Sequence, residues 1–263
     1  MKLSQTTSIK KILNTFGMED SKPVLTPIEK GTLLTPEVKD ITKQPYRELL
    51  GRLMYLMLCV RPDLCFAVGY LGRFQQNPGD EHWVVLKRIL RYLKGTLDLK
   101  LEYSKINNEK LVGFADADWG SSSYDRKSTS GYIFYVFGCP VSWCSKKQQT
   151  VATSTSEAEY IALSAAVSEG LWLRGILQDL KVFKPNEAFT IYEDNAGCIS
   201  MAKNMECKRS KHIDIKHHFI RDHVNKGELK IEYIATKNQI ADILTKPLDN
   251  NSFRAIRRMV FLN

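Results

Sequence analysis

Four carboxylates stand at positions where side-chain packing alone gives no reason for an acid. Asp116 and Asp194 each lie near the end of an apolar, strand-like run. Glu159 lies in the first turn of a long helical pattern, and Asp242 opens the last helical pattern of the chain. Because strand ends and helix starts meet at one edge of a mixed sheet, we expect these four side chains to come together.

A pocket of four carboxylates needs divalent cations to offset the mutual repulsion of the negative charges. Oxygen-only ligands suit Mg²⁺ or Mn²⁺. Two such ions about 4 Å apart can hold a water molecule and a phosphodiester for in-line displacement. The pattern therefore indicates metal-dependent phosphodiester hydrolysis.

Each acid also has an ordinary structural explanation, which spacing alone leaves open. Glu159 and Asp242 could each complement the positive end of a helix, and Asp194 could cap one. Asp116 competes with Asp118 for the first position, because residues i and i+2 share one face of a strand.

The sequence that must position these acids has a helical part followed by strands and helices. Apolar residues recur at helical spacing in residues 46–60, 63–74 and 82–93. Strand-like runs follow at 111–117, 131–136, 139–144, 189–193 and 229–234. Helical patterns cover 157–180, with Trp172 and Ile176 on the expected apolar face, and 196–203, 208–226 and 239–245. A meander followed by alternating β and α elements predicts an α/β fold with helices packed on a mixed sheet.

Charge points to a polyanionic partner. Lys and Arg number 38 against 29 Asp and Glu, so the formal net charge is +9. The residues predicted to contact phosphates are Lys127, Lys146, Lys147, Lys208, Arg209, Lys211 and Lys216. A solvated helix face is the alternative for the last four.

No apolar run is long enough to span a bilayer and no secretory signal follows Met1, so we expect neither a membrane nor a secreted protein.

Several longer motifs are more specific than the four acids. They are Gly113–Trp119, Asp125–Tyr132, Ser145–Gln149, Thr155–Leu163, Ile191–Asn195, Lys211–Lys216 and Asn238–Leu248. Together they resemble the ribonuclease H domain of copia-type retrotransposon Pol polyproteins. Upstream, Tyr46–Leu56, Arg61–Asp63 and Glu81–Thr96 resemble the end of the reverse transcriptase of the same polyprotein, its thumb or connection region.

The resemblance implies a five-stranded mixed sheet flanked by helices, and cleavage of the RNA strand of RNA–DNA hybrids. It implies two Mg²⁺ ions, with Mn²⁺ as a substitute, and selects Asp116 over Asp118 as the acid that bridges both ions. By the same resemblance, Glu159 and Asp194 lie near the leaving-group ion, and Asp242 near the ion that activates the attacking water. The loop 234–238 departs from the ribonuclease H pattern, because it lacks the histidine usual before the last helix.

We accordingly expect a truncated reverse-transcriptase-like helical module over residues 1–105, a ribonuclease H-like domain over 106–250 and a C-terminal tail over 251–263. No Tyr-x-Asp-Asp motif of a polymerase occurs. Two alternatives remain: a catalytically silent nucleic-acid-binding remnant of a decayed element, and an integrase-like polynucleotidyl transferase. The expected partners are an RNA–DNA hybrid and other Pol-derived proteins, and the expected location is the cytoplasm, retrotransposon particles or the nucleus.

Overall fold

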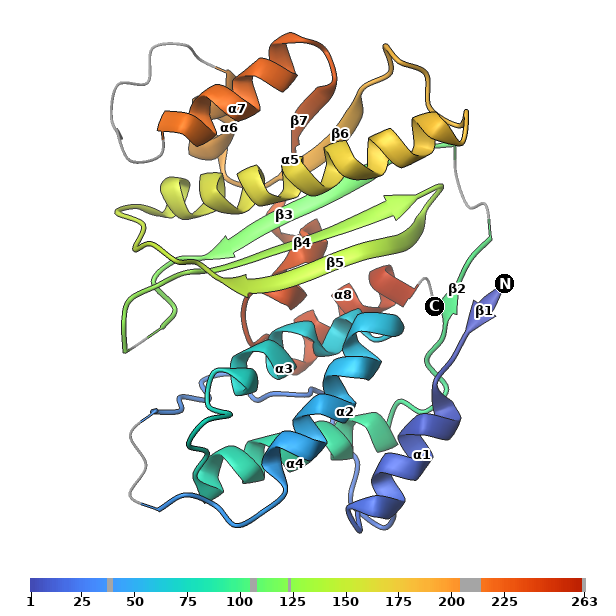
Figure 1. Ribbon diagram of the computed structural model, residues 1–263, viewed down its shortest axis with the longest axis vertical. Coiled ribbons are helices and arrows are strands. Elements are labelled where there is room, and N and C mark those ends of the chain that lie inside the picture. The colour runs from blue at the N-terminus through green and yellow to red at the C-terminus, as the bar shows by residue number, and fades with distance from the viewer. Residues whose placement is uncertain (37–39, 105–107, 123, 204–213, 262–263) are drawn as a thin grey trace. The chain divides into compact units, whose positions relative to one another are not determined.

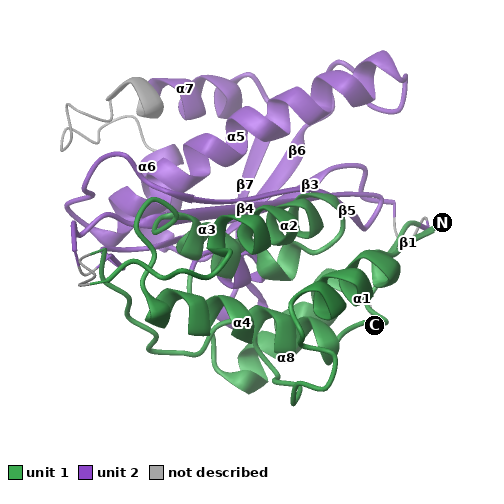
Figure 2. Cartoon of the chain, turned by 60° about the horizontal axis from the view of Figure 1, so that its bottom comes forward, with its two compact units in different colours: residues 1–103, 246–263 green, residues 104–245 purple. Residues whose placement is uncertain are grey.

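The computed structural model describes residues 1–36, 40–104, 108–122, 124–203 and 214–261 (Figure 1). The chain forms two compact units, which Figure 2 shows in different colours. Unit 1 comprises residues 1–103 and 246–263, and unit 2 comprises residues 104–245. Within the described ranges, no helix combines the length and the hydropathy that crossing a membrane requires.

Unit 1 is mostly helical. Its elements are the strands β1 (Lys2–Leu3) and β2 (Leu101–Glu102), the helices α1 (Thr6–Thr15), α2 (Tyr46–Cys59), α3 (Cys65–Gly72), α4 (Asp80–Lys94) and α8 (Asn250–Phe261), and the 3₁₀ turn η1 (Pro62–Leu64). The helical pattern at 63–74 is thus a 3₁₀ turn followed by a shorter α-helix. Proline at the first position of η1 fixes the backbone there.

Residues 251–261 of the expected C-terminal tail belong to a helix. This helix is α8, whose Phe253, Ile256, Val260 and Phe261 are buried. These side chains recur at helical spacing, so the helix has one apolar face to bury. That face packs in unit 1, where Arg257 donates a hydrogen bond to the Tyr92 hydroxyl (3.3 Å).

Unit 2 contains the expected five-stranded mixed sheet, in the order β5-β4-β3-β6-β7. The strands are β3 (Val112–Asp118), β4 (Thr129–Val136), β5 (Cys139–Lys147), β6 (Phe189–Glu193) and β7 (Leu229–Tyr233). The first three pair antiparallel, whereas β6 pairs parallel with both β3 and β7. The helices are α5 (Thr155–Asp179), α6 (Ala196–Lys203) and α7 (Asp214–Asn225), and two 3₁₀ turns, η3 (Thr236–Asn238) and η4 (Ile240–Leu244), follow β7.

Helix α5 packs on the sheet and contacts β3 and β4 (Figure 1). It begins at a side-chain cap, where Ser154 Oγ accepts a hydrogen bond from the Glu157 N–H (3.2 Å). Further along, a Cβ on Gly170 would lie 2.3 Å from the ring of Phe189, so only glycine lets α5 approach this closely. The cap and the close approach fix where the first turn of α5 meets the strand ends.

One expectation about α5 was wrong. Trp172 and Ile176 were expected on its buried face, but they are 59% and 38% exposed. Leu173, one residue beyond Trp172, is buried instead, and Leu177, which belongs to the expected apolar face, is buried as expected. Because successive residues are rotated by about 100° around an α-helix, apolar residues cover two sides of α5 and only one side packs on the sheet.

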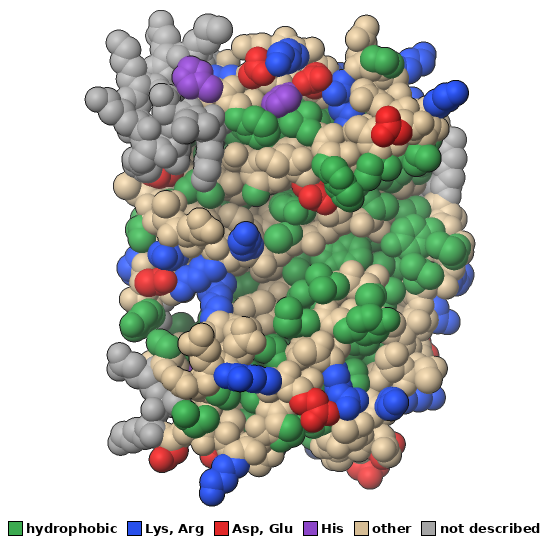
Figure 3. Space-filling model, in the orientation of Figure 1, with side chains coloured by type: hydrophobic (Ala, Val, Ile, Leu, Met, Phe, Trp, Pro, Cys, Tyr) green, Lys and Arg blue, Asp and Glu red, His purple; other side chains and the backbone are tan. Residues whose placement is uncertain are grey.

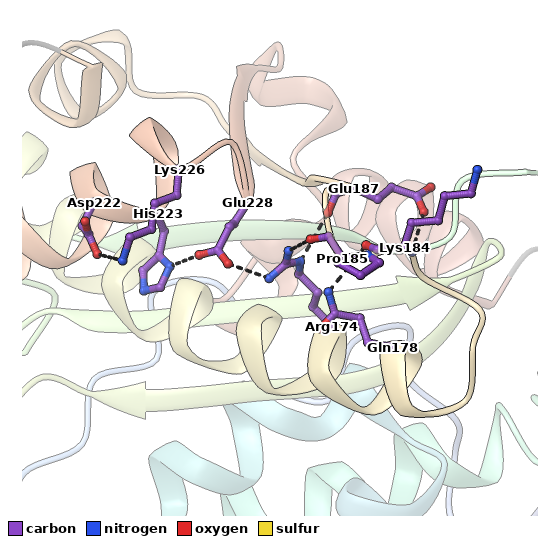
Figure 4. Close-up of polar contacts among 9 residues, drawn as sticks. All are labelled: Arg174, Gln178, Lys184, Pro185, Glu187, Asp222, His223, Lys226 and Glu228. Atoms are coloured by element: carbon purple, nitrogen blue, oxygen red, sulfur yellow. Dashed lines mark hydrogen bonds and ion pairs between the residues drawn. The ribbon is translucent and has the colours of Figure 1, made fainter.

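A buried arginine joins α5 to two later segments of unit 2, the loop with Pro185 and Glu187 and the turn with Glu228 (Figure 4). Arg174 donates hydrogen bonds to Glu228 Oε1 (2.9 Å), to the Glu187 carbonyl (3.2 Å) and to the Pro185 carbonyl (2.5 Å). The other oxygen of Glu228 lies 2.6 Å from Nδ1 of His223. The hydrogen bond with His223 is the largest effect that holds the pKa of Glu228 below its usual value, and Arg174 adds to it.

We predict that Arg174→Met lowers the free energy of unfolding by about 3 kcal/mol, because Oε1 of Glu228 and the carbonyls of Pro185 and Glu187 lose the donor that Arg174 supplies. Glu228, with its lowered pKa, stabilises the fold above its unfolded pKa, and this contribution is lost as the pH falls through the folded pKa. The difference in the free energy of unfolding between the parent and Arg174→Met should therefore shrink below about pH 4. Urea unfolding from pH 3 to 8 measures this difference. The control is Gln178→Met, because the amide of Gln178 makes only a 3.5 Å contact with the Lys184 carbonyl. Equal losses in the two variants would contradict the prediction.

Candidate functional site

Three of the four predicted acids come together where β3, α5 and β6 meet. One carboxylate oxygen from each of Asp116, Glu159 and Asp194 lies within 4.8 Å of the others. Asp116 is on β3, Glu159 is in the first turns of α5, and Asp194 directly follows β6. The group contains Asp116 and not Asp118. Glu157 is part of the α5 start, since its carboxylate accepts the Thr153 N–H (2.8 Å).

Glu159 is the most perturbed acid of this group. Burial is the main reason that its pKa rises to about 11, and the neighbouring Glu193, Asp116 and Asp194 raise it further. A hydrogen bond from the backbone of Ala117 works in the opposite direction. The Oε2 atom is buried and has no hydrogen-bond partner among the described residues. This buried oxygen is therefore suited to bind a cation, and none of the described residues provides one.

Glu193 is a fifth acid that the sequence analysis missed. It is fully buried at the end of β6, where its Oε1 accepts the N–H of Asn195 (3.1 Å). Burial is the first cause that raises the pKa of Glu193, and the charges of Asp116 and Asp194 add to it. The period-2 pattern held the signal, because Phe189, Ile191 and Glu193 share the buried face of β6.

Asp242 lies outside the group of three and belongs to η4. It is buried, and its segment is held against β3 by two side chains. Thr245 Oγ1 donates a hydrogen bond to Asp116 Oδ2, and Gln239 Nε2 donates one to the Ala115 carbonyl (2.9 Å). The segment is not the helix expected over 239–245: its 3₁₀ turn begins where Gln239 Oε1 accepts the N–H of Ala241 (3.2 Å). Neither Thr245 nor Gln239 was singled out from the sequence.

The donor set fits a hard divalent cation. Asp116, Glu159 and Asp194 offer oxygen atoms only, which are the ligands that Mg²⁺ and Mn²⁺ prefer. The repulsion that raises the pKa of Glu159 would be relieved by a positive charge at the centre of the group. Metal binding would also require this carboxylate to lose its proton.

The residues predicted to contact phosphates lie in different parts of unit 2, and some lie outside the described residues. Lys127 lies in the β3–β4 loop, and Lys146 is exposed near the end of β5. Lys147 is paired with Asp125 (2.8 Å) and donates to Ser122 (3.2 Å). Lys208, Arg209 and Lys211 lie outside the described residues, and Lys216 is in α7, at a position where only the backbone is described.

Comparison with known proteins gives long matches to transposon polyproteins. The chain is 40% identical over 267 residues to the retrovirus-related Pol polyprotein from transposon TNT 1-94 of Nicotiana tabacum, covering 98% of this chain and 20% of that protein. It is 39% identical over 263 residues to the corresponding polyprotein from transposon RE2 of Arabidopsis thaliana, with 98% and 18% covered. The chain thus spans about a fifth of the length of these relatives. No family model matches.

Solved structures also match this chain, at low sequence identity. A foamy viral protease–reverse transcriptase (dRH), solved in complex with double-stranded DNA, matches with a TM-score of 0.50 and 14% identity over 88% of this chain and 35% of that chain. LC11-RNase H1, solved in complex with an RNA/DNA hybrid, matches with a TM-score of 0.40 and 14% identity over 52% and 94%. The mixed sheet with its flanking helices has the ribonuclease H-like fold.

We predict that the metal-free protein loses stability as the pH rises from about 4, the ordinary pKa of a glutamate, toward 9. A buried acid with a raised pKa favours the fold fully only below its unfolded pKa, and this contribution is lost up to its folded pKa of about 11. Glu159→Gln should flatten this dependence and reduce the rise in melting temperature that Mg²⁺ gives at pH 8. Thermal unfolding with EDTA or MgCl₂ measures both effects.

The matched control is Glu232→Gln, which removes an exposed acid from β7. This variant should keep the pH dependence and the magnesium response of the parent. Metal-free stability that stays constant between pH 5 and 9 would refute the expected repulsion.

Proposed function

This chain belongs to the retrovirus-related Pol polyproteins of copia-type transposons, and from that premise we propose that unit 2 is a metal-dependent endoribonuclease that cleaves the RNA strand of RNA–DNA hybrids. One observation carries the proposal. Three acids from separate elements converge to within 4.8 Å at a buried site of a ribonuclease H-like sheet. Packing alone does not account for this arrangement, because buried carboxylates repel one another.

In this proposal, Asp116, Glu159, Asp194 and Asp242 hold two Mg²⁺ ions, or two Mn²⁺ ions. When bound, these ions supply a nucleophilic water and stabilise the charge that develops on the phosphodiester. The catalytic role of Asp242 rests on the family resemblance, since Asp242 is not one of the three converging acids.

Other residues of the chain keep the acids in position. Thr245 donates a hydrogen bond to Asp116 and thereby limits the directions in which that carboxylate turns. Asn195 joins two helices near Asp194: its Oδ1 accepts bonds from Ser156 Oγ (3.1 Å) and from the Cys198 N–H (2.9 Å). These bonds fix the start of α6 against the start of α5, and both helices begin at the site.

Binding of the substrate is assigned to basic residues around the site. Lys127, Lys146 and Lys147 come from the β3–β4 loop and the end of β5, both of which adjoin the acid-bearing end of β3. Their positive charge suits the phosphates of a nucleic acid and makes binding dependent on salt. We propose the same role for Lys208, Arg209, Lys211 and Lys216.

We predict that the full chain with Mg²⁺ cleaves a labelled RNA strand annealed to DNA, and that Asp116→Asn and Glu159→Gln each slow cleavage at least about a hundredfold. The loss of one ligand removes several kcal/mol of transition-state stabilisation. Gel analysis of the products over time measures the rate.

The Glu232→Gln variant serves as the control and should retain the rate of the parent. Binding of the hybrid without cleavage would support a silent nucleic-acid-binding module instead. Joining of strands would support a polynucleotidyl transferase.

A further inference from the structure

A groove runs in unit 2 between the side of α5 and strands β4 and β5, with a cavity volume of about 560 Å³. The strands contribute Tyr132, Cys144 and Lys146 to one wall. The helix contributes Ser164 and Ser168 to the other. None of the catalytic acids lines this groove.

One end of the groove adjoins the acidic site. Ser130 lines the groove and pairs in register with Ala117, the residue after Asp116. Gln148 also lines it, and its Nε2 donates to the carbonyl of Ala158 (2.9 Å), the residue before Glu159. Ser168 lies about 14 Å further along the helix axis than Glu159 at 1.5 Å per residue, on the opposite side of α5, because nine residues turn the helix by about two and a half turns. A strand that leaves the acidic site reaches this groove by passing around the first turn of α5, because Asp116 and Ala117 point to opposite faces of the sheet.

The chemistry of the walls changes along this path. Lys146 lines the groove, is exposed near the acidic end, and shares one face of β5 with Cys144, because side chains two residues apart in a strand point the same way. Serine hydroxyls follow along α5. One helical turn beyond Ser168 stands Trp172, with 59% of its surface exposed. The carboxylate of Glu169 is bound by the Ser142 hydroxyl (2.5 Å).

The surface view agrees with this change. On the face in Figure 3, Lys and Arg side chains gather at the left, at the height of the sheet, and hydrophobic side chains gather to the right. Helix α5 runs from left to right on this face in Figure 1. A cation followed by hydroxyl groups and an exposed indole suits a phosphate, a sugar and an unpaired base in succession.

We propose that this groove binds a single-stranded polynucleotide extension of the substrate, with a phosphate at Lys146 and a base stacked on Trp172; the proposal rests on the nuclease function above. A single strand fits better than a duplex, because an aromatic face stacks only on a base that is free of its own neighbours in a helix. An apolar peptide would leave the Lys146 ammonium without a partner of matching chemistry, whereas a polynucleotide brings a phosphate to it.

The test measures binding of the full chain by fluorescence anisotropy, with a hybrid whose RNA strand is 2′-O-methylated so that it is not cleaved. The hybrid is blunt or carries a single-stranded extension of about eight nucleotides, within the length that one binding groove covers. The extension is RNA in one arm and DNA in the other. We expect the extension to lower the Kd about tenfold, as stacking of one base and one phosphate contact would give. A gain in either arm supports the proposal, and the larger gain identifies the preferred strand.

Trp172→Ala should remove most of the gain in affinity that the extension gives and leave the affinity for the blunt hybrid unchanged. Lys146→Ala should also reduce this gain in affinity. The matched controls are Tyr233→Ala and Lys230→Ala, which remove an exposed aromatic residue and an exposed lysine from β7. Both control variants should keep the gain in affinity from the extension. Melting temperatures check that each variant is folded.

An extension that does not change the Kd of the parent overturns the groove proposal, as does a Trp172→Ala variant that keeps the full gain. Loss of the gain in Tyr233→Ala also overturns it. Cleavage of the blunt unmodified hybrid is measured separately. Cleavage without a gain from the extension refutes the groove alone, and a gain without cleavage refutes the nuclease alone.

Discussion

Repulsion among buried carboxylates is the constraint on which the rest of unit 2 depends. Asp116, Glu159 and Asp194 are held within 4.8 Å of one another, and Glu193 lies fully buried beside them. Burial and these neighbouring charges raise the pKa of Glu159 to about 11. A fold keeps such a group only if its other contacts outweigh the electrostatic cost, so the packing around the site must be both dense and well fixed.

The packing of α5 meets that requirement. The Ser154 cap sets where the helix begins, and Gly170 lets its second half lie directly on Phe189. Further along, Arg174 joins the helix to Glu228 and to the carbonyls of 185 and 187. Anchors near both ends of a 25-residue helix leave little freedom for Glu159 to move away from Asp116. The local strain of the site is thus balanced by contacts well away from it.

The sequence predicts the parts of this arrangement that follow from local patterns. Alternation of apolar residues identified the strands, and the helical pattern over 157–180 identified α5, which begins two residues earlier at Thr155. Three of the four chosen acids converge, and Asp242 lies in a segment attached to β3. The catalytic roles of all four stay predictions.

What the sequence did not reveal depends on contacts between distant segments. Thr245 acts on Asp116 across 129 positions of the chain, and no local pattern marks such a pair. Trp172 was assigned to the core because an apolar residue at helical spacing is typical of a buried face. Only the position of the sheet decides which of two apolar sides of α5 is covered.

The two proposals give α5 two roles, one on each side of the helix. Its first turns supply Glu159 to the acidic site, while its outer side forms a wall of the groove that leads to Trp172. Since both sides belong to one rigid helix, the distance between the acids and the groove is fixed by the helical rise and not by a flexible loop. The anchors at the two ends of α5 therefore serve the groove as well as the acids. A loss of packing at Gly170 or Arg174 would disturb cleavage and groove binding together, whereas a change at Trp172 would disturb groove binding alone.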